Sequence, residues 1–90
     1  IMTGRNLVAR IPGSVSFEHA SFATLGAIAI NSVRIARISL GDTVVVLGLG
    51  LVGQLVAQLA RAQGARVVAV DLNSDRVELA RTLGADHVVA

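Results

Sequence analysis

The 90-residue sequence contains no cysteine, tryptophan, tyrosine or lysine, and only one proline. The lack of cysteine excludes disulfides, thiolate zinc sites and a cysteine nucleophile from these residues, and it is compatible with the cytoplasm, where we expect the protein. Because all eight basic residues are arginine and the net charge is only +2, the chain has no dense basic patch. We therefore expect no nucleic-acid partner.

Charged residues are also scarce, and none occurs between residues 43 and 60. These 18 residues reach the lower length limit of a membrane-spanning helix. Three glycines and two glutamines interrupt the stretch, however, and it begins with β-branched residues. This pattern favours a strand, a turn and a helix, so we predict no membrane insertion.

With 53% hydrophobic residues, the chain is more apolar than a domain of its size needs. The sequence also starts at Ile1 and ends at Ala90, within a predicted strand. We therefore expect a piece of a larger protein, whose exposed apolar strand edges favour a homo-oligomer.

The most informative stretch is VVVLGLGLVG, residues 44–53, in which an apolar strand runs into a G-x-G-x-x-G turn and then a helix. Such a turn directs backbone N–H groups from a helix N-terminus toward a dinucleotide pyrophosphate. Gly48 allows the sharp turn, Gly50 allows the pyrophosphate to approach the main chain, and Gly53 allows close helix–strand packing. Any side chain at Gly50 should block the ligand.

An acidic residue, Asp71, closes the next predicted strand, residues 66–70. It follows Gly53 by 71 − 53 = 18 residues, close to the roughly 20 expected for a carboxylate that binds the adenosine ribose. A carboxylate favours NAD over NADP, because a 2′-phosphate would meet a like charge. The nearby Arg76 is an argument in the opposite direction.

Alternating helix and strand patterns predict an α/β fold, namely the first half of a Rossmann-type doubly wound sheet with three parallel strands. The first strand, residues 43–47, is apolar enough to be covered on both faces. A helix over residues 17–37 precedes it and should be buried on most sides, with close packing or a ligand near Gly26. In the helix that follows the turn, the predicted buried positions are Val52, Leu55, Val56 and Leu59.

Four runs of the sequence together resemble the medium-chain dehydrogenase/reductase family, which includes the zinc-type alcohol dehydrogenases: LGDTVVVLGLGLVG (40–53), GARVVAVD (64–71), RVELA (76–80) and LGADHV (83–88). The resemblance implies an enzyme that transfers hydride between a nicotinamide cofactor and an alcohol or carbonyl substrate. It also implies that residues 1–15 are the end of a catalytic domain or a linker and that residues 16–90 are part of the NAD-binding domain. By this resemblance the cofactor-binding residues are Gly48, Gly50 and Gly53 in the turn, Leu51 and Val52 as backbone donors, and Asp71 at the ribose.

The sequence departs from the zinc-dependent pattern near the start of the helix after Pro12. Zinc-dependent members carry a cysteine or glutamate ligand there, whereas this chain has Ala23 and Thr24. Metal-free quinone and enoyl reductases share the family fold, so zinc dependence stays open. We identify no metal ligand and no catalytic residue; His19 and His87 are assigned capping or surface roles.

Two other functions remain open from the sequence. The chain can be a nucleotide-binding or structural module without redox chemistry, since it shows no identifiable catalytic residue. It can also be part of a methyltransferase, because S-adenosylmethionine sites use a glycine turn and an acid after the second strand. We expect the segment alone to be inactive and to bind NAD weakly.

Overall fold

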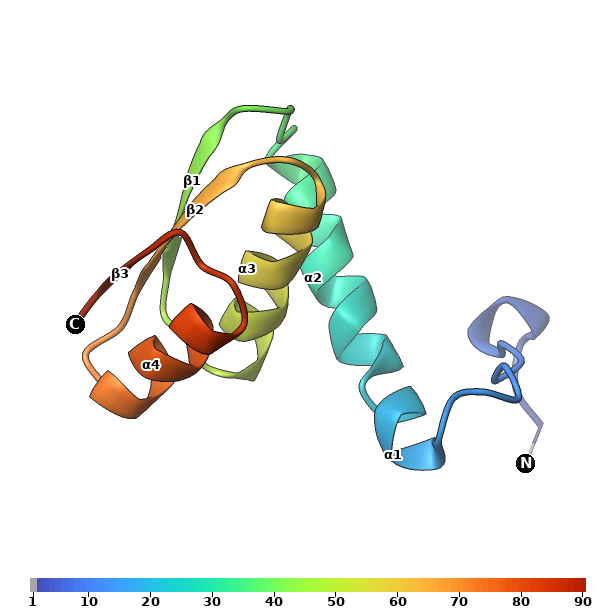
Figure 1. Ribbon diagram of the computed structural model, residues 1–90. Helices are drawn as coiled ribbons and strands as arrows, with labels where there is room; N and C mark the ends of the chain where they lie inside the picture. Colours follow the sequence, from blue (N-terminus) through green and yellow to red (C-terminus); the bar gives the residue numbers. More distant parts are fainter. Residues whose placement is uncertain (1) are drawn as a thin grey trace.

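The computed structural model describes residues 2–90, in which helices and strands alternate from residue 23 onward (Figure 1). The elements are, in chain order, a 3-10 helix (Arg5–Leu7), α1 (Phe17–Ala20), α2 (Ala23–Ile35), β1 (Thr43–Leu47), α3 (Leu51–Ala62), β2 (Arg66–Val70), α4 (Ser74–Thr82) and β3 (His87–Val89). Within these residues, no helix has both the length and the apolar composition needed to cross a bilayer.

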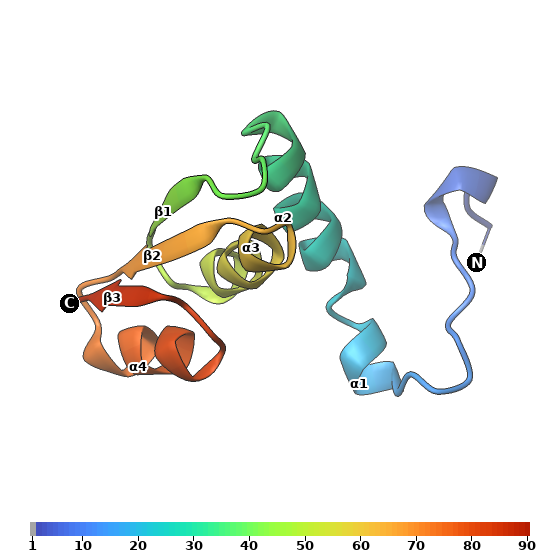
Figure 2. The same cartoon turned by 45° about the horizontal axis from the view of Figure 1, so that its top comes forward.

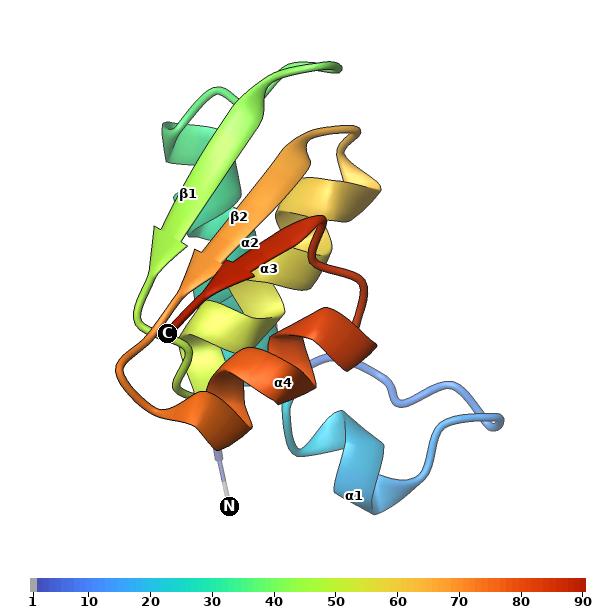
Figure 3. The same ribbon diagram turned by 60° about the vertical axis from the view of Figure 1, so that its left-hand side comes forward.

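The three strands form one parallel sheet in the order β1-β2-β3. The register places Val45 opposite Val68, which in turn lies opposite His87. Because both crossovers progress in the same direction, right-handed connections put α3 and α4 on one side of the sheet. Figure 3 shows α2 and α3 behind the strands. The predicted α/β fold with three parallel strands is confirmed.

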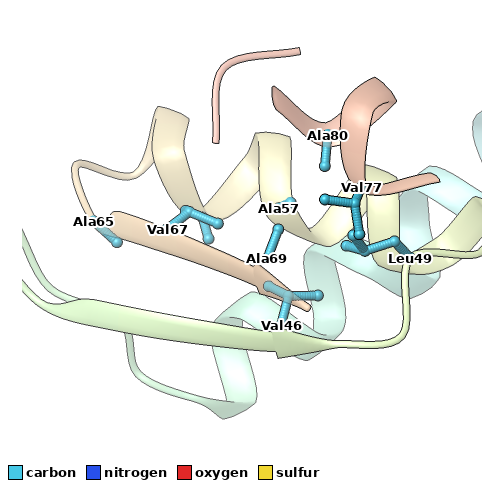
Figure 4. Packing of buried hydrophobic residues seen from close by; sticks show 9 residues of the cluster. Val46, Leu49, Ala57, Ala65, Val67, Ala69, Val77 and Ala80 are labelled. Carbon is cyan, nitrogen blue, oxygen red and sulfur yellow. The ribbon is translucent and has the colours of Figure 1, made fainter. Parts of the chain in front are cut away.

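The hydrophobic core lies between the sheet and the two crossover helices (Figure 4). Alanines dominate the helix side of this contact, so the helix backbones approach the strands closely. The buried residues of the cluster are Val46, Leu49, Ala57, Ala60, Ala65, Val67, Ala69, Val77 and Ala80.

The face of α3 that meets the sheet differs from the prediction. The structure buries Gln54, Ala57 and Ala60, whereas the predicted set of Val52, Leu55, Val56 and Leu59 is only partly buried. Close approach of α3 to the strands leaves room for small side chains at the interface. The larger apolar side chains therefore lie along the flanks of the helix, toward α2 and α4.

The expectation that β1 is covered on both faces is wrong for the described residues. Val46 is buried under the helices, but Val45 is 56% exposed and Leu47 is 77% exposed on the opposite face. Val89 of β3 is also exposed and lies in the same cross-strand row as Leu47. The strands are apolar at nearly every position, yet the described helices cover only one side of the sheet.

The single, mostly buried helix predicted over residues 17–37 is also wrong. Residues 21–22 separate α1 from α2, and α1 lies away from the sheet with the preceding segment (Figure 2). In α2 only Ala29 and Val33 are buried, because α3 is the main element packed against it. An added Cβ at Gly26 would meet no described atom within 4 Å, so the expected close packing there is not found.

An ion pair fixes the far end of the sheet. Arg61, near the end of α3, lies 2.8 Å from Oδ1 of Asp86, while the Val67 N–H donates to Oδ2 of Asp86 at 2.8 Å. The Val67 N–H and the Arg61 guanidinium together hold the pKa of the Asp86 carboxyl below its ordinary value of 3.8. One carboxylate therefore joins α3, β2 and the start of β3.

We predict that Asp86 contributes to stability in a pH-dependent way. Because its pKa is lowered in the folded state, the contribution is present above about pH 4 and is lost as the pH falls through the folded-state pKa. Asp86→Asn should therefore lower the urea midpoint at about pH 7, with a smaller deficit at about pH 3.

The matched control is Glu78→Gln, which removes the exposed Glu78–Arg81 pair on α4. That variant should keep its urea midpoint nearly unchanged, since exposed ion pairs contribute little. A deficit of Asp86→Asn that is equal at both pH values would contradict the assigned role of the charge.

Candidate cofactor-binding site at the glycine turn

The turn between β1 and α3 is built around a glycine with left-handed backbone geometry. Gly48 has φ +90°, a region that side chains strongly disfavour, and its N–H donates to the Val70 carbonyl at 2.8 Å. Gly50 then starts α3 as its N-cap with extended backbone (φ −66°, ψ −170°), and no side chain caps the helix. The first amides of α3 therefore remain available to an acceptor outside the helix.

The other two glycines of the motif differ in what surrounds them. A Cβ built on Gly53 would overlap the Gly48 carbonyl oxygen and lie 2.9 Å from its carbon, so the close approach of α3 to the turn requires glycine. A Cβ on Gly50 would meet nothing within 4 Å. Packing therefore does not explain Gly50, and the space above it is open to a ligand.

Asp71 lies at the mouth of this turn. Its Oδ2 accepts a hydrogen bond from the Leu49 N–H at 2.7 Å, and its Oδ1 accepts one from the Asn73 N–H at 2.8 Å. These two N–H groups, Leu49 first, lower the pKa of the Asp71 carboxyl below its ordinary value, with a further contribution from Arg76. The Arg76 guanidinium is 3.8 Å away, and the Asp71 side chain is 10% exposed. The carboxylate is thus ionised and held in one position.

The structure brings Gly48 and Asp71 together in a cleft of about 370 Å³ at the carboxyl ends of β1 and β2. Ligands of parallel α/β sheets bind at this end of the strands. The cleft combines apolar walls with one anionic group, and it is lined by Leu47, Gly48, Val70, Asp71, Leu72 and Ala90.

The remaining predicted residues line two other hollows that meet at the turn. Gly50 and Leu51 border a cleft of about 680 Å³ between α1, α3 and α4, and Val52 and Gly53 border a groove of about 410 Å³ between β1 and α2. Of the three hollows described, the largest contains neither Gly48 nor Asp71. The arrangement of chemical groups, rather than the volume, therefore identifies the candidate site.

One residue at the site was missed by the sequence analysis. Gln54, one turn into α3, is only 7% exposed, and its Nε2 donates to the carbonyls of Leu49 and Arg76. The available signal was its position three residues before Ala57 and six before Ala60, on the helix face that the structure buries. Glutamine is common on exposed helix faces, so the sequence alone gave little reason to place it in the core.

Residues 2–90 include no group of three or more His, Cys, Asp or Glu side chains that could hold a metal ion. His19 is in α1 and His87 begins β3, and both are exposed. Ala23 begins α2 and carries no ligand atom. The described side chains therefore do not form a zinc site.

Comparison with known proteins identifies relatives of this chain. A family model described as zinc-binding dehydrogenase matches residues 52–90. An alcohol dehydrogenase of Geobacillus stearothermophilus is 39% identical over 83 residues, which are 91% of this chain and 25% of the relative. A D-xylulose reductase of Saccharomyces cerevisiae is 38% identical over 88 residues, 97% of this chain and 25% of the relative.

Solved structures show the same similarity in three dimensions. A mycobacterial protein complexed with NADPH gives a TM-score of 0.83 at 32% identity, over 94% of this chain and 27% of that protein. An Escherichia coli protein described as a short chain alcohol dehydrogenase, complexed with NADH, gives 0.85 at 28% identity, over 90% of this chain and 25% of that protein.

This chain spans about a quarter of the length of the curated relatives it matches. Within that span, the sequence similarity and the fold similarity cover the same features: the glycine turn, the strand that ends at Asp71 and the crossover helices. The chain therefore belongs to the medium-chain dehydrogenase/reductase family, which includes the zinc-type alcohol dehydrogenases.

Proposed function

We propose that the intact protein containing this chain is an NAD(H)-dependent oxidoreductase that transfers hydride between the nicotinamide and an alcohol or carbonyl substrate. The observation that carries the proposal is the ionised Asp71 carboxylate, fixed 2.7 Å from the Leu49 amide beside an open glycine turn. The dehydrogenase and reductase relatives support this function over a non-catalytic module or a methyltransferase.

The turn fits the pyrophosphate of such a cofactor. Gly48 and Gly50 would let its oxygens approach the main chain, and the N–H groups of Leu51 and Val52 at the start of α3 would donate to them. Open space above Gly50 and the missing side-chain cap on α3 both support this assignment. When bound, the cofactor supplies the hydride acceptor or donor.

Asp71 would bind the adenosine ribose and favour NAD over NADP. Each carboxylate oxygen already accepts one backbone hydrogen bond and has further acceptor capacity for a ribose hydroxyl. A 2′-phosphate would be repelled by this charge, by about 1–4 kcal/mol at 4 Å between water-like and surface-like dielectric values. Arg76 offsets part of this repulsion, since its guanidinium is half exposed beside the carboxylate.

We also propose residues 1–15 as the end of a preceding domain or a linker and residues 16–90 as part of the cofactor domain. Ser16 supports this boundary, because it is the N-cap of α1 and its Oγ accepts a hydrogen bond from the His19 N–H at 3.1 Å. The residues described before it contain only the short 3-10 helix and no buried side chain.

We further propose that the protein assembles as a homo-oligomer, which the exposed apolar side chains of α2 and β1 support. We propose the cytoplasm as its compartment.

We predict that the intact protein binds NADH more tightly than NADPH in a fluorescence titration. Asp71→Ala should weaken NADH by about 1–3 kcal/mol, because two charge-assisted hydrogen bonds to the ribose are lost, and should weaken NADPH less. Asp75→Asn, which removes a nearby exposed charge, serves as the control and should leave both affinities unchanged. Tighter binding of NADPH to the unmodified protein would overturn the role given to Asp71.

Two glycine variants should separate binding from folding. Gly50→Ala should keep the thermal stability of the protein but abolish measurable NADH binding, because the added methyl group lies in open space that the pyrophosphate would occupy. Gly53→Ala should lower the stability by about 1–3 kcal/mol, because its methyl group overlaps the Gly48 carbonyl, and should also lose NADH binding. Thermal melts and calorimetric titrations measure the two effects, and undiminished NADH affinity of Gly50→Ala would refute the pyrophosphate assignment.

A further inference from the structure

A glutamine side chain bridges two segments of the candidate site from inside the core. The Nε2 of Gln54 donates to the Leu49 carbonyl at 3.3 Å and to the Arg76 carbonyl at 2.8 Å. Leu49 belongs to the glycine turn, and Arg76 belongs to the first turn of α4. A single amide therefore fixes the separation between these two segments.

This bridge closes a ring of hydrogen bonds around the carboxylate. The Leu49 N–H and the Asn73 N–H donate to the two oxygens of Asp71. Asn73 in turn caps α4, since its Oδ1 accepts the Arg76 N–H at 3.2 Å. Gln54 completes the ring from Arg76 back to Leu49. Leu49 is thus held at both its N–H and its carbonyl.

The amide of Gln54 is not explained by packing. Its Oε1 is buried without a partner in the described structure, which is unfavourable for a polar atom. An apolar side chain of similar length, such as methionine, would avoid that penalty. The Nε2 donor is the part of the amide that matters, because it gives a hydrogen-bond partner to the carbonyl of Leu49, a residue that is almost fully buried.

We propose that Gln54 is a positioning residue that holds Leu49, and through the Leu49 N–H the Asp71 carboxylate, in the geometry that grips the adenosine ribose. It thereby sets the preference for NADH over NADPH, because only NADH offers Asp71 both ribose hydroxyls without a 2′-phosphate. The proposal rests on the cofactor assignment under Proposed function. Gln54 would act on the ribose through Asp71 and would not touch the cofactor itself.

The test measures the Kd of NADH and of NADPH for the intact protein and its variants. Gln54→Met should weaken NADH by about three- to tenfold, equivalent to one hydrogen bond, and weaken NADPH less. The ratio of the NADPH Kd to the NADH Kd should therefore fall. The control is Gln58→Met on the same helix, where Nε2 bonds only to the Gln54 carbonyl at 3.2 Å, and this ratio should stay unchanged.

A double-mutant cycle with Asp71→Asn tests the route of the effect. If Gln54 acts through Asp71, Gln54→Met should change the ratio little once Asp71 is already Asn. Should Gln54→Met fail to fold, Gln54→Asn gives the same comparison, because its amide is one methylene too short to reach both carbonyls.

Two results would overturn the proposal: an unchanged ratio, which includes an equal loss of both affinities, or full additivity with Asp71→Asn. Either result, in a protein that prefers NADH and loses that preference in Asp71→Asn, would leave the cofactor assignment intact. Failure of the unmodified protein to bind NADH would instead overturn the proposed function itself.

Discussion

The hydrogen bond from the Leu49 amide to the Asp71 carboxylate is the interaction on which the rest of the site depends. It joins the end of β1 to the end of β2, and it is one of two backbone bonds that lower the pKa of Asp71. Because the acceptor is a charged group and its side chain is mostly buried, the bond is stronger than one between neutral groups. The glycine turn and the Asp71 carboxylate are therefore one rigid unit.

That unit depends on how closely α3 approaches the sheet. Gly53 allows the helix to start directly against the Gly48 carbonyl, and the alanines further along α3 continue the close contact. The same approach places Gln54 beneath the turn, within reach of Leu49 and α4. The small side chains of the core and the open turn above it therefore both accompany the short distance between α3 and the sheet.

The sequence predicts the strands, the turn and the place of Asp71 well, because glycine spacing and apolar runs constrain the backbone directly. It fails where neighbours decide the outcome. The larger apolar residues of α3, such as Val52 and Leu59, suggested the wrong contact face, since size does not show how close a helix lies. The apolar sequence of β1 predicts a strand covered on both sides, although Val45 is exposed. Gln54 was missed because a helical glutamine is ordinarily solvated.

The one-sided sheet has a thermodynamic consequence. When these residues fold as a separate segment, side chains that already face water, such as Leu47 and Val89, expose little new apolar area on melting. Since newly hydrated apolar area produces most of the heat-capacity increment, that increment should fall below the usual range of about 12–15 cal/mol/K per residue. The stability curve of these residues is accordingly flatter with temperature than that of a domain with a sheet covered on both sides.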